Sequence, residues 1–209
     1  MSVLSRENSS RLLWLGRYSE RVYTTLRYFA DIFDAMIDKT LPGVFESKEE
    51  FSARFCFDEG DESSVYSSLI RAYDNAIELR EELGSDTFSY IQLAVYEMNK
   101  AKNSPAPLLQ LQRVIDNIAA FWGMADDRIE DEHARSIIKL GKRIERVDLY
   151  ARMRAGRNEL VREIRRLTHR IPQTGLTYDE EAVRRLNVLA SEEIMNYPAI
   201  IAEAASLLG

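Results

Sequence analysis

One phrase of the sequence occurs twice, and it constrains the fold more than any other feature. Residues Leu13–Val22 read LWLGRYSERV, and residues Ile138–Val147 read IKLGKRIERV. The Leu, Gly, Glu, Arg and Val recur at identical offsets, and Arg27 is matched by Arg152. Residues three, four and seven apart share one face of a helix, so both copies predict a helix that buries the same apolar stripe. A glycine within a helix is less favourable than alanine by about 1 kcal/mol, and its recurrence indicates the close approach of another helix or a bound group.

Apolar residues recur at the helical period along most of the remaining chain. The predicted helices cover residues 5–39, 63–83, 87–102, 106–122, 127–155 and 158–170, with a last helix from about 177 to 208 kinked at Pro198. A capping box at residues 47–50 predicts one further short helix towards Phe55. No strand or hairpin pattern competes with this interpretation. The sequence therefore predicts an all-α fold, a single domain over residues 1–209. It would be a bundle of about six or seven mostly antiparallel helices, with a pseudo-repeat between the first and the fifth.

The overall composition argues against several classes of protein. The 209 residues are 45% hydrophobic and 30% charged, which is typical of a soluble globular chain. No apolar run approaches the roughly 18 residues of a membrane helix, and the first residues lack a secretory signal. Cys56 is the one cysteine, so an intramolecular disulfide is excluded. We expect a cytoplasmic protein that does not bind a membrane.

The charge of the chain is unevenly distributed. The net charge of −6 argues against general nucleic-acid binding. Residues 142–170 nevertheless contain ten Lys or Arg and four Asp or Glu, whereas residues 46–62 are acidic. Two interpretations remain open: basic helices that pack beside acidic ones, or a surface that binds anions.

The two glutamates of the repeat, Glu20 and Glu145, also allow two interpretations. A carboxylate surrounded by arginines makes a poor general base but a good anchor. The first interpretation is an Arg–Glu network that locks the first and fifth helices together about a pseudo-two-fold axis. The second places the two copies on opposite walls of a polar cleft, where paired guanidinium groups hold a carboxylate or phosphate.

Motifs for a metal or a nucleotide cofactor are incomplete or missing. Glu130 and His133 have the E-x-x-H spacing of di-iron helical bundles, but such sites need a second pair and further glutamates. No phosphate-binding loop, dinucleotide fingerprint or nucleophile-elbow phrase occurs. We therefore expect neither a bound metal nor a cofactor.

Four motifs, in the same order, resemble the bacterial alpha-E domain family. They begin at Arg11 (RLLWLGRYxER, followed by Thr25 and Arg27), at Asp74 (DNAxxxR), at Met98 (an apolar-Asn pair) and at Leu140 (LGKxxERVD, followed by Arg152). The resemblance covers about residues 4–153, and residues 157–209 lie beyond it. The chain departs from the family pattern at Lys142, which replaces an arginine, at Phe88, which replaces a tryptophan, and at Val22 and Val147, which replace alanines.

The resemblance implies an all-helical domain that works beside other proteins. Members of the family are typically encoded next to, or fused to, a circularly permuted ATP-grasp ligase and a transglutaminase-like cysteine peptidase. We therefore expect an accessory or interaction domain in the synthesis or processing of amide-linked peptides. Its partner would be such a protein, and its ligand an acidic peptide or a small carboxylate or phosphate. The sequence gives no prediction of the oligomeric state.

The resemblance also carries over the predicted site residues. The residues expected to bind the anion or the partner are Arg17, Arg21, Arg27, Asn75, Arg80, Arg146, Asp148 and Arg152. The alternative is an enzyme in its own right, a peptide or amide ligase or hydrolase, with Glu20 or Glu145 as its acid or base. The two hypotheses differ in an observable way, because a base must be reachable by substrate, whereas an anchor is buried and paired.

Overall fold

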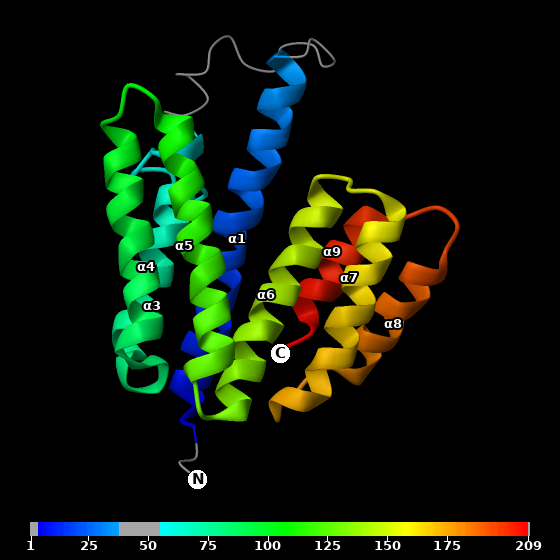
Figure 1. Ribbon diagram of the computed structural model, residues 1–209. Coiled ribbons are helices and arrows are strands. Elements are labelled where there is room, and N and C mark those ends of the chain that lie inside the picture. Colours follow the sequence, from blue (N-terminus) through cyan, green and yellow to red (C-terminus); the bar gives the residue numbers. More distant parts are fainter. Residues whose placement is uncertain (1–3, 38–54, 209) are drawn as a thin grey trace. The chain divides into compact units, whose positions relative to one another are not determined.

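The computed structural model describes residues 4–37 and 55–208, and this part of the chain contains helices and no strand (Figure 1). The helices are α1 (Arg6–Ile37), α3 (Val65–Glu78), α4 (Arg80–Lys102), α5 (Pro107–Arg128), α6 (Glu132–Arg152), α7 (Arg157–Arg170), α8 (Glu180–Ser191) and α9 (Tyr197–Ser206), with a short 3-10 helix at Ile171–Thr174. The predicted all-α fold class is confirmed. The predicted helix that begins at residues 47–50 lies outside the described residues.

Local capping sets the helix ends that the periodicity placed approximately. The helix predicted from residue 127 begins at Glu132, because the Asp131 side chain accepts a hydrogen bond from the Ala134 amide at 2.9 Å. The helix predicted from residue 87 is part of α4, which starts at Arg80 and is interrupted at Gly84. Gly84 has φ of 71°, a conformation that glycine adopts readily.

The predicted single helix at the C-terminus is wrong. The chain forms two helices there, because α8 ends at Ser191 and α9 begins at Tyr197. The Asn196 side chain accepts a hydrogen bond from the Ala199 amide at 3.2 Å and so caps α9. Pro198 lies in the first turn of α9, where its missing N–H is not needed, and it does not kink a helix.

The contacts group the chain into two compact units. Unit 1 comprises residues 1–20 and 131–209, and unit 2 comprises residues 21–130. Helix α1 contributes its first part to unit 1 and its second part to unit 2. A single domain over residues 1–209 therefore stays a prediction.

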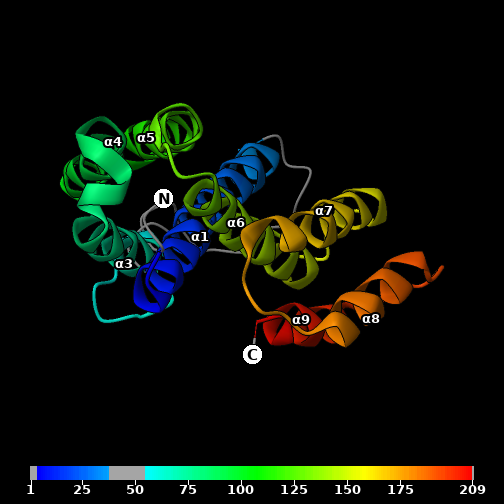
Figure 2. The same cartoon turned by 90° about the horizontal axis from the view of Figure 1, so that it is seen from below.

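Four helices of unit 1 form a closed ring around an apolar core. Helix α6 packs against α7 and α9, and α8 also packs against α7 and α9 (Figure 2). The apolar residues of each helix recur at the helical period and point inward. The buried core includes Leu140, Ile144, Val147, Leu160, Ile164, Leu167, Leu186 and Ile200. This core fixes the positions of α6 and α7, the two helices that carry most of the basic residues discussed below.

Unit 2 is built from α3, α4, α5 and the second part of α1. Helix α4 packs against both α3 and α5, and Tyr23 of α1 contacts Trp122 of α5 with ring centroids 4.7 Å apart. Cys56 is fully buried, and burial raises the pKa of its thiol to about 12. A thiol with this pKa is protonated and inert at neutral pH, which suits a core residue.

The described helices of both units contain no stretch that is long and apolar enough to span a membrane.

Candidate functional site

The two glycines of the repeated phrase bring α1 and α6 into backbone contact within unit 1. A Cβ atom at Gly16 would lie closer than 3.0 Å to the backbone carbonyl oxygen of Ile138. A Cβ atom at Gly141 would likewise lie closer than 3.0 Å to the backbone carbonyl oxygen of Leu13. The neighbouring atoms belong to the backbone, so they cannot move aside as a flexible side chain could. The predicted close approach is therefore confirmed, and the group that approaches each glycine is the other copy of the phrase.

Each glutamate of the repeat is bound by an arginine from the opposite helix. Arg146 donates from Nε and Nη2 to the Glu20 carboxylate at 2.5 and 2.9 Å, and Arg17 donates from Nε to Glu145 Oε2 at 2.9 Å. Both glutamates are 0% exposed. We call the set Gly16, Arg17, Glu20, Gly141, Glu145 and Arg146 the Arg–Glu junction.

The two ion pairs do not use equivalent positions of the repeat. Arg17 corresponds in the repeat to Lys142, whereas Arg146 corresponds to Arg21. The two glutamates therefore occupy equivalent positions of the repeat, whereas the two arginines of these ion pairs occupy different positions of it. The glycines and the carboxylates are therefore related reciprocally between the two helices.

The arginines of the junction are held on more than one side. The Arg17 guanidinium lies 4.6 Å from the ring centroid of Trp14, which in turn stacks on Tyr18 at 5.2 Å. Burial of Arg146 acts to lower its pKa, but the charge of Glu20 and the hydrogen bonds to it outweigh burial, so the pKa is raised. The side chains of Arg17 and Arg146 remain 19% and 15% exposed. Little of either is left to contact a ligand.

This geometry decides what the two carboxylates can do chemically. A general acid or base must come within hydrogen-bond reach of a substrate atom. Glu20 and Glu145 are inaccessible and already accept charge-assisted hydrogen bonds from arginine. The arrangement matches the anchor interpretation and argues against either residue as a catalytic acid or base.

Two further predicted site residues of unit 1 form a pair of their own. Arg152 donates from Nε and Nη2 to the Asp148 carboxylate at 2.6 and 3.0 Å, one turn away on α6. The hydrogen bond to Asp148 is the largest cause of the raised pKa of Arg152. Arg152 is mostly exposed, so part of its guanidinium faces solvent.

The other four predicted site residues belong to unit 2. Arg27 is exposed and donates to the Tyr23 hydroxyl at 3.3 Å. The Asn75 amide donates to the Arg71 carbonyl oxygen at 3.0 Å, within α3. The Arg80 guanidinium lies 5.3 Å from the Phe88 ring centroid. Arg21, the fourth, is partly buried on α1. These positions are local to unit 2, whereas Arg17, Arg146, Asp148 and Arg152 lie in unit 1.

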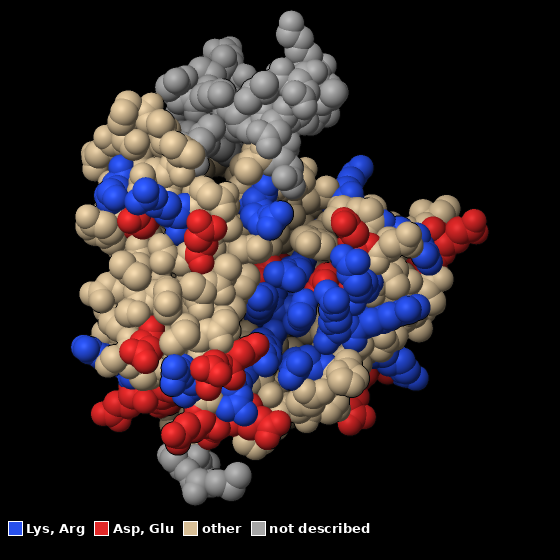
Figure 3. Space-filling model, in the orientation of Figure 1, with Lys and Arg blue, Asp and Glu red and all other residues tan. Residues whose placement is uncertain are grey.

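A cluster of arginines that the predicted site omitted lies along α7. A pocket of about 780 Å³ in unit 1 is lined mainly by these residues. Figure 3 shows Lys and Arg side chains gathered over α6 and α7. The excess of basic residues between 142 and 170 was the sequence signal for this surface. We call the set Arg143, Arg157, Arg162, Arg165, Arg166 and Arg170 the α7 basic face.

A second pocket in unit 1 has a mixed lining. It measures about 1120 Å³ and lies between the start of α1, the segment before α8, and the end of α9. Trp14, Arg17, Tyr178 and Asp179 line it together with several apolar residues. Its basic and acidic residues give it no dominant charge, so it offers less to an anion than the α7 basic face does.

The E-x-x-H spacing does not become a metal site in the structure. Glu130 lies between α5 and α6, and His133 lies in the first turn of α6 beside Gly175. Among the residues that the structure describes, no three His, Cys, Asp or Glu side chains are placed to hold a metal ion.

Comparison with known proteins finds one family. A family model named alpha-E, described as a predicted alpha-helical domain with a conserved ER motif, matches residues 3–165. Both Glu–Arg dipeptides of the repeated phrase, at residues 20–21 and 145–146, lie within this range. No match was found among curated proteins or among solved structures.

Proposed function

Because the chain belongs to the alpha-E family, we propose that it is a helical accessory domain that acts through a partner protein. The proposed partner is an ATP-grasp-type ligase or a transglutaminase-like peptidase that makes or processes amide-linked peptides. The domain would bind an anionic group of that partner or of its peptide, either a carboxylate or a phosphate. The resemblance of the four motifs to the family supports the choice of partner.

The observation that carries the proposal is the complete burial of Glu20 and Glu145 against arginines of the opposite helix. These are the acidic residues that the repeat offers to an enzyme, and their proposed role is to hold α1 and α6 together. A buried ion pair fixes geometry more than it adds stability. The junction would therefore fix the position of α6, and with it the basic residues that α6 carries.

The exposed members of the predicted set are the candidate contacts with a partner. Arg27, Arg80 and Arg152 are exposed. The other members of the set outside the Arg–Glu junction are partly buried, namely Arg21, Asn75 and Asp148. Arginine suits this role because its planar fork binds a carboxylate or phosphate through two parallel hydrogen bonds. Arg17 and Arg146 would act indirectly, by positioning α1 and α6.

The test has two arms that address partner and catalysis separately. A tagged chain is purified under native conditions from its own cells, and the proteins that accompany it are identified by mass spectrometry. The proposal predicts an ATP-grasp-type or transglutaminase-like protein among them, and recovery of neither overturns it.

The second arm assays the purified chain alone for amide ligation and hydrolysis. The proposal predicts no turnover. Turnover that Glu20→Gln or Glu145→Gln abolishes, without a change in melting temperature, would establish the enzyme hypothesis instead.

A further inference from the structure

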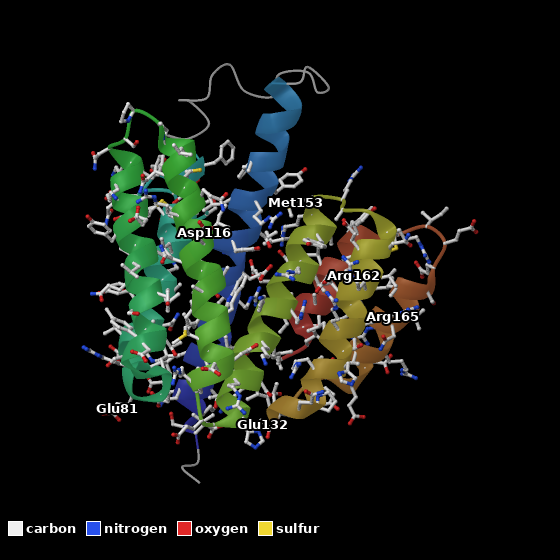
Figure 4. All side chains as sticks on the ribbon, viewed as in Figure 1. Glu81, Asp116, Glu132, Met153, Arg162 and Arg165 are labelled. Carbon is white, nitrogen blue, oxygen red and sulfur yellow. The ribbon has the colours of Figure 1, made fainter. Side chains whose placement is uncertain are left out.

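The α7 basic face concentrates positive charge in one pocket. Arginines project from α7 at residues 157, 162, 165, 166 and 170, and α6 contributes Arg143. Residues three and four apart share one face of a helix, so Arg162, Arg165 and Arg166 lie together. Figure 4 labels Arg162 and Arg165 on α7. All six arginines line the same volume of about 780 Å³.

One buried carboxylate organises part of this pocket without neutralising it. Glu163 is 2% exposed and accepts hydrogen bonds from Arg143 Nη1 at 2.5 Å and from Arg166 Nη1 at 2.7 Å. Arg162 Nε lies 3.9 Å from the same carboxylate. A single negative charge thus faces three guanidinium groups, and positive charge remains on the surface. Glu163 also fixes where two of those groups lie.

Two of the three remaining arginines are held by neutral acceptors. Arg157 donates to the Glu192 backbone carbonyl oxygen at 2.9 and 3.3 Å, and Arg170 donates to Gln173 Oε1 at 2.7 Å. Arg165 is exposed and has no carboxylate within 4.0 Å among the residues that the structure describes. Neutral acceptors orient a guanidinium and leave its charge intact, so four of the six arginines are oriented by hydrogen bonds and the pocket stays strongly positive.

The chemistry of the pocket favours an acidic peptide over single-stranded nucleic acid or a lipid surface. No Trp, Tyr or Phe lines it, so the stacking platform of single-stranded nucleic-acid sites is missing from this pocket. The apolar residues of α7, such as Leu160, Ile164 and Leu167, are buried in the core of unit 1 and are not available to insert into lipid. Guanidinium groups spaced along a helix match carboxylates spaced along a peptide.

We propose that the α7 basic face binds an acidic peptide segment, one that carries several Asp or Glu side chains. This rests on the proposed function, because the segment would belong to the partner protein or to the peptide that the partner processes. Arg162 and Arg165 would contact the segment directly. Arg143 and Arg166, positioned by Glu163, would form the floor of the site.

The experiment measures the affinity of a short fluorescent oligoglutamate peptide by fluorescence anisotropy at low salt. The double variant Arg162→Gln/Arg165→Gln removes two exposed charges from the face. Arg113→Gln/Arg128→Gln is the matched control. It removes the same charge from α5, where both side chains are similarly exposed. The proposal predicts that Kd rises about tenfold for the first variant and changes by less than about twofold for the control.

Three outcomes overturn the proposal. Equal weakening by both double variants would mean that the peptide responds only to net charge. An oligothymidylate of equal charge that binds more tightly, with the same dependence on Arg162 and Arg165, would make the face a nucleic-acid site. Failure of the wild-type chain to bind the peptide at all would also refute it. A variant that does not fold, judged by circular dichroism, is replaced by Arg165→Gln alone.

Failure of this inference can be told apart from failure of the proposed function. If the expected partner accompanies the wild-type chain and the Arg162→Gln/Arg165→Gln variant equally, the partner proposal stands and the α7 basic face is not the contact. If the expected partner is not recovered while the oligoglutamate peptide binds as predicted, the peptide site stands and the proposed partner is wrong.

Discussion

The Arg–Glu junction and the α7 basic face both combine arginine with glutamate, but the consequences for the two regions are opposite. At the junction, Glu20 and Glu145 are buried, and each is bound by an arginine from the other helix. On the α7 basic face, the one carboxylate of Glu163 faces three arginines, and Arg157 and Arg170 are held by neutral acceptors. The exposure of the arginines and the ratio of charges, more than residue type, separate a structural ion pair from a surface that can bind a ligand.

The contrast has an energetic consequence. Removing one partner of a buried ion pair leaves an uncompensated charge and is strongly destabilising. Removing an exposed charge changes stability little, because water solvates what remains. Variants at the junction should therefore affect folding, and variants on the α7 basic face should affect binding.

The largest effect is expected from Gly141→Ala. The new Cβ would clash with the Leu13 backbone carbonyl, so α1 and α6 would have to separate and both ion pairs would be strained. We expect the free energy of unfolding to fall by about 3 kcal/mol, measured by chemical denaturation. The control is Gly123→Ala on α5, where a Cβ meets no atom within 4 Å and alanine should raise stability slightly. Equal effects of the two variants would contradict a glycine-dependent contact.

A smaller but clear loss is expected from Glu145→Gln. The Arg17 guanidinium would lose its charged partner in a buried setting, so the free energy of unfolding should fall by about 2 kcal/mol. Arg152→Gln serves as the comparison. It removes an ion pair with Asp148 whose arginine is exposed, and should change stability by less than about 0.5 kcal/mol. If Arg152→Gln lowered the free energy of unfolding more than Glu145→Gln did, burial would not explain the difference between the two ion pairs.

Tyr150 allows a test by pH, because the pKa of its hydroxyl depends on charged residues at the Arg–Glu junction and at the α7 basic face. Burial raises the pKa of its hydroxyl, Arg146 acts against this, and the charges of Glu163 and Glu20 add to it. The folded state therefore holds this proton more tightly than the unfolded chain does. The resulting stability is complete below the ordinary pKa of 10.0 and is lost as pH rises through the folded value.

The variant for this test is Tyr150→Phe, which cannot ionise. We expect the stability of the wild-type chain to fall faster than that of Tyr150→Phe as the pH is raised above 10, in parallel denaturant titrations. Identical pH profiles for the two proteins would mean that the hydroxyl titrates alike in the folded and unfolded chain.

The smallest effect on stability is expected from Arg162→Gln/Arg165→Gln. Both side chains are exposed, and relief of repulsion between arginines offsets the weak attraction to Glu163. We expect a change within about 0.5 kcal/mol in either direction, by thermal or chemical denaturation. A loss near that of Glu145→Gln would place the α7 basic face among the structural networks.

Periodicity predicted the helices because the helical repeat is a local property of the chain. The repeated phrase also predicted a close approach at Gly16 and Gly141, by another helix or by a bound group, and the structure shows that it is another helix. The helix ends depend on single hydrogen bonds, such as that of Asp131, which the pattern locates only approximately. The gap between α8 and α9 was missed because Pro198 is compatible with a kink and with a first turn alike.

The candidate site could be predicted only in part. The repeat identified Glu20, Glu145 and the basic residues around them, but not which arginine binds which glutamate. That choice depends on how far a side chain reaches across two packed helices, which the spacing of residues in the sequence does not give. The α7 basic face combines Arg143 of α6 with residues of α7, so it exists only once the core of unit 1 has brought these helices together.

A double-mutant cycle at Glu20 and Arg146 tests the central claim most directly. The free energy of unfolding is measured for the wild-type chain, Glu20→Gln, Arg146→Gln and the double variant. If the pair locks α1 to α6, each single variant loses stability, the double variant loses less than their sum, and the coupling energy is about 2 kcal/mol. Single variants as stable as the wild type, with a coupling energy near zero, would show that the junction does not hold the helices together.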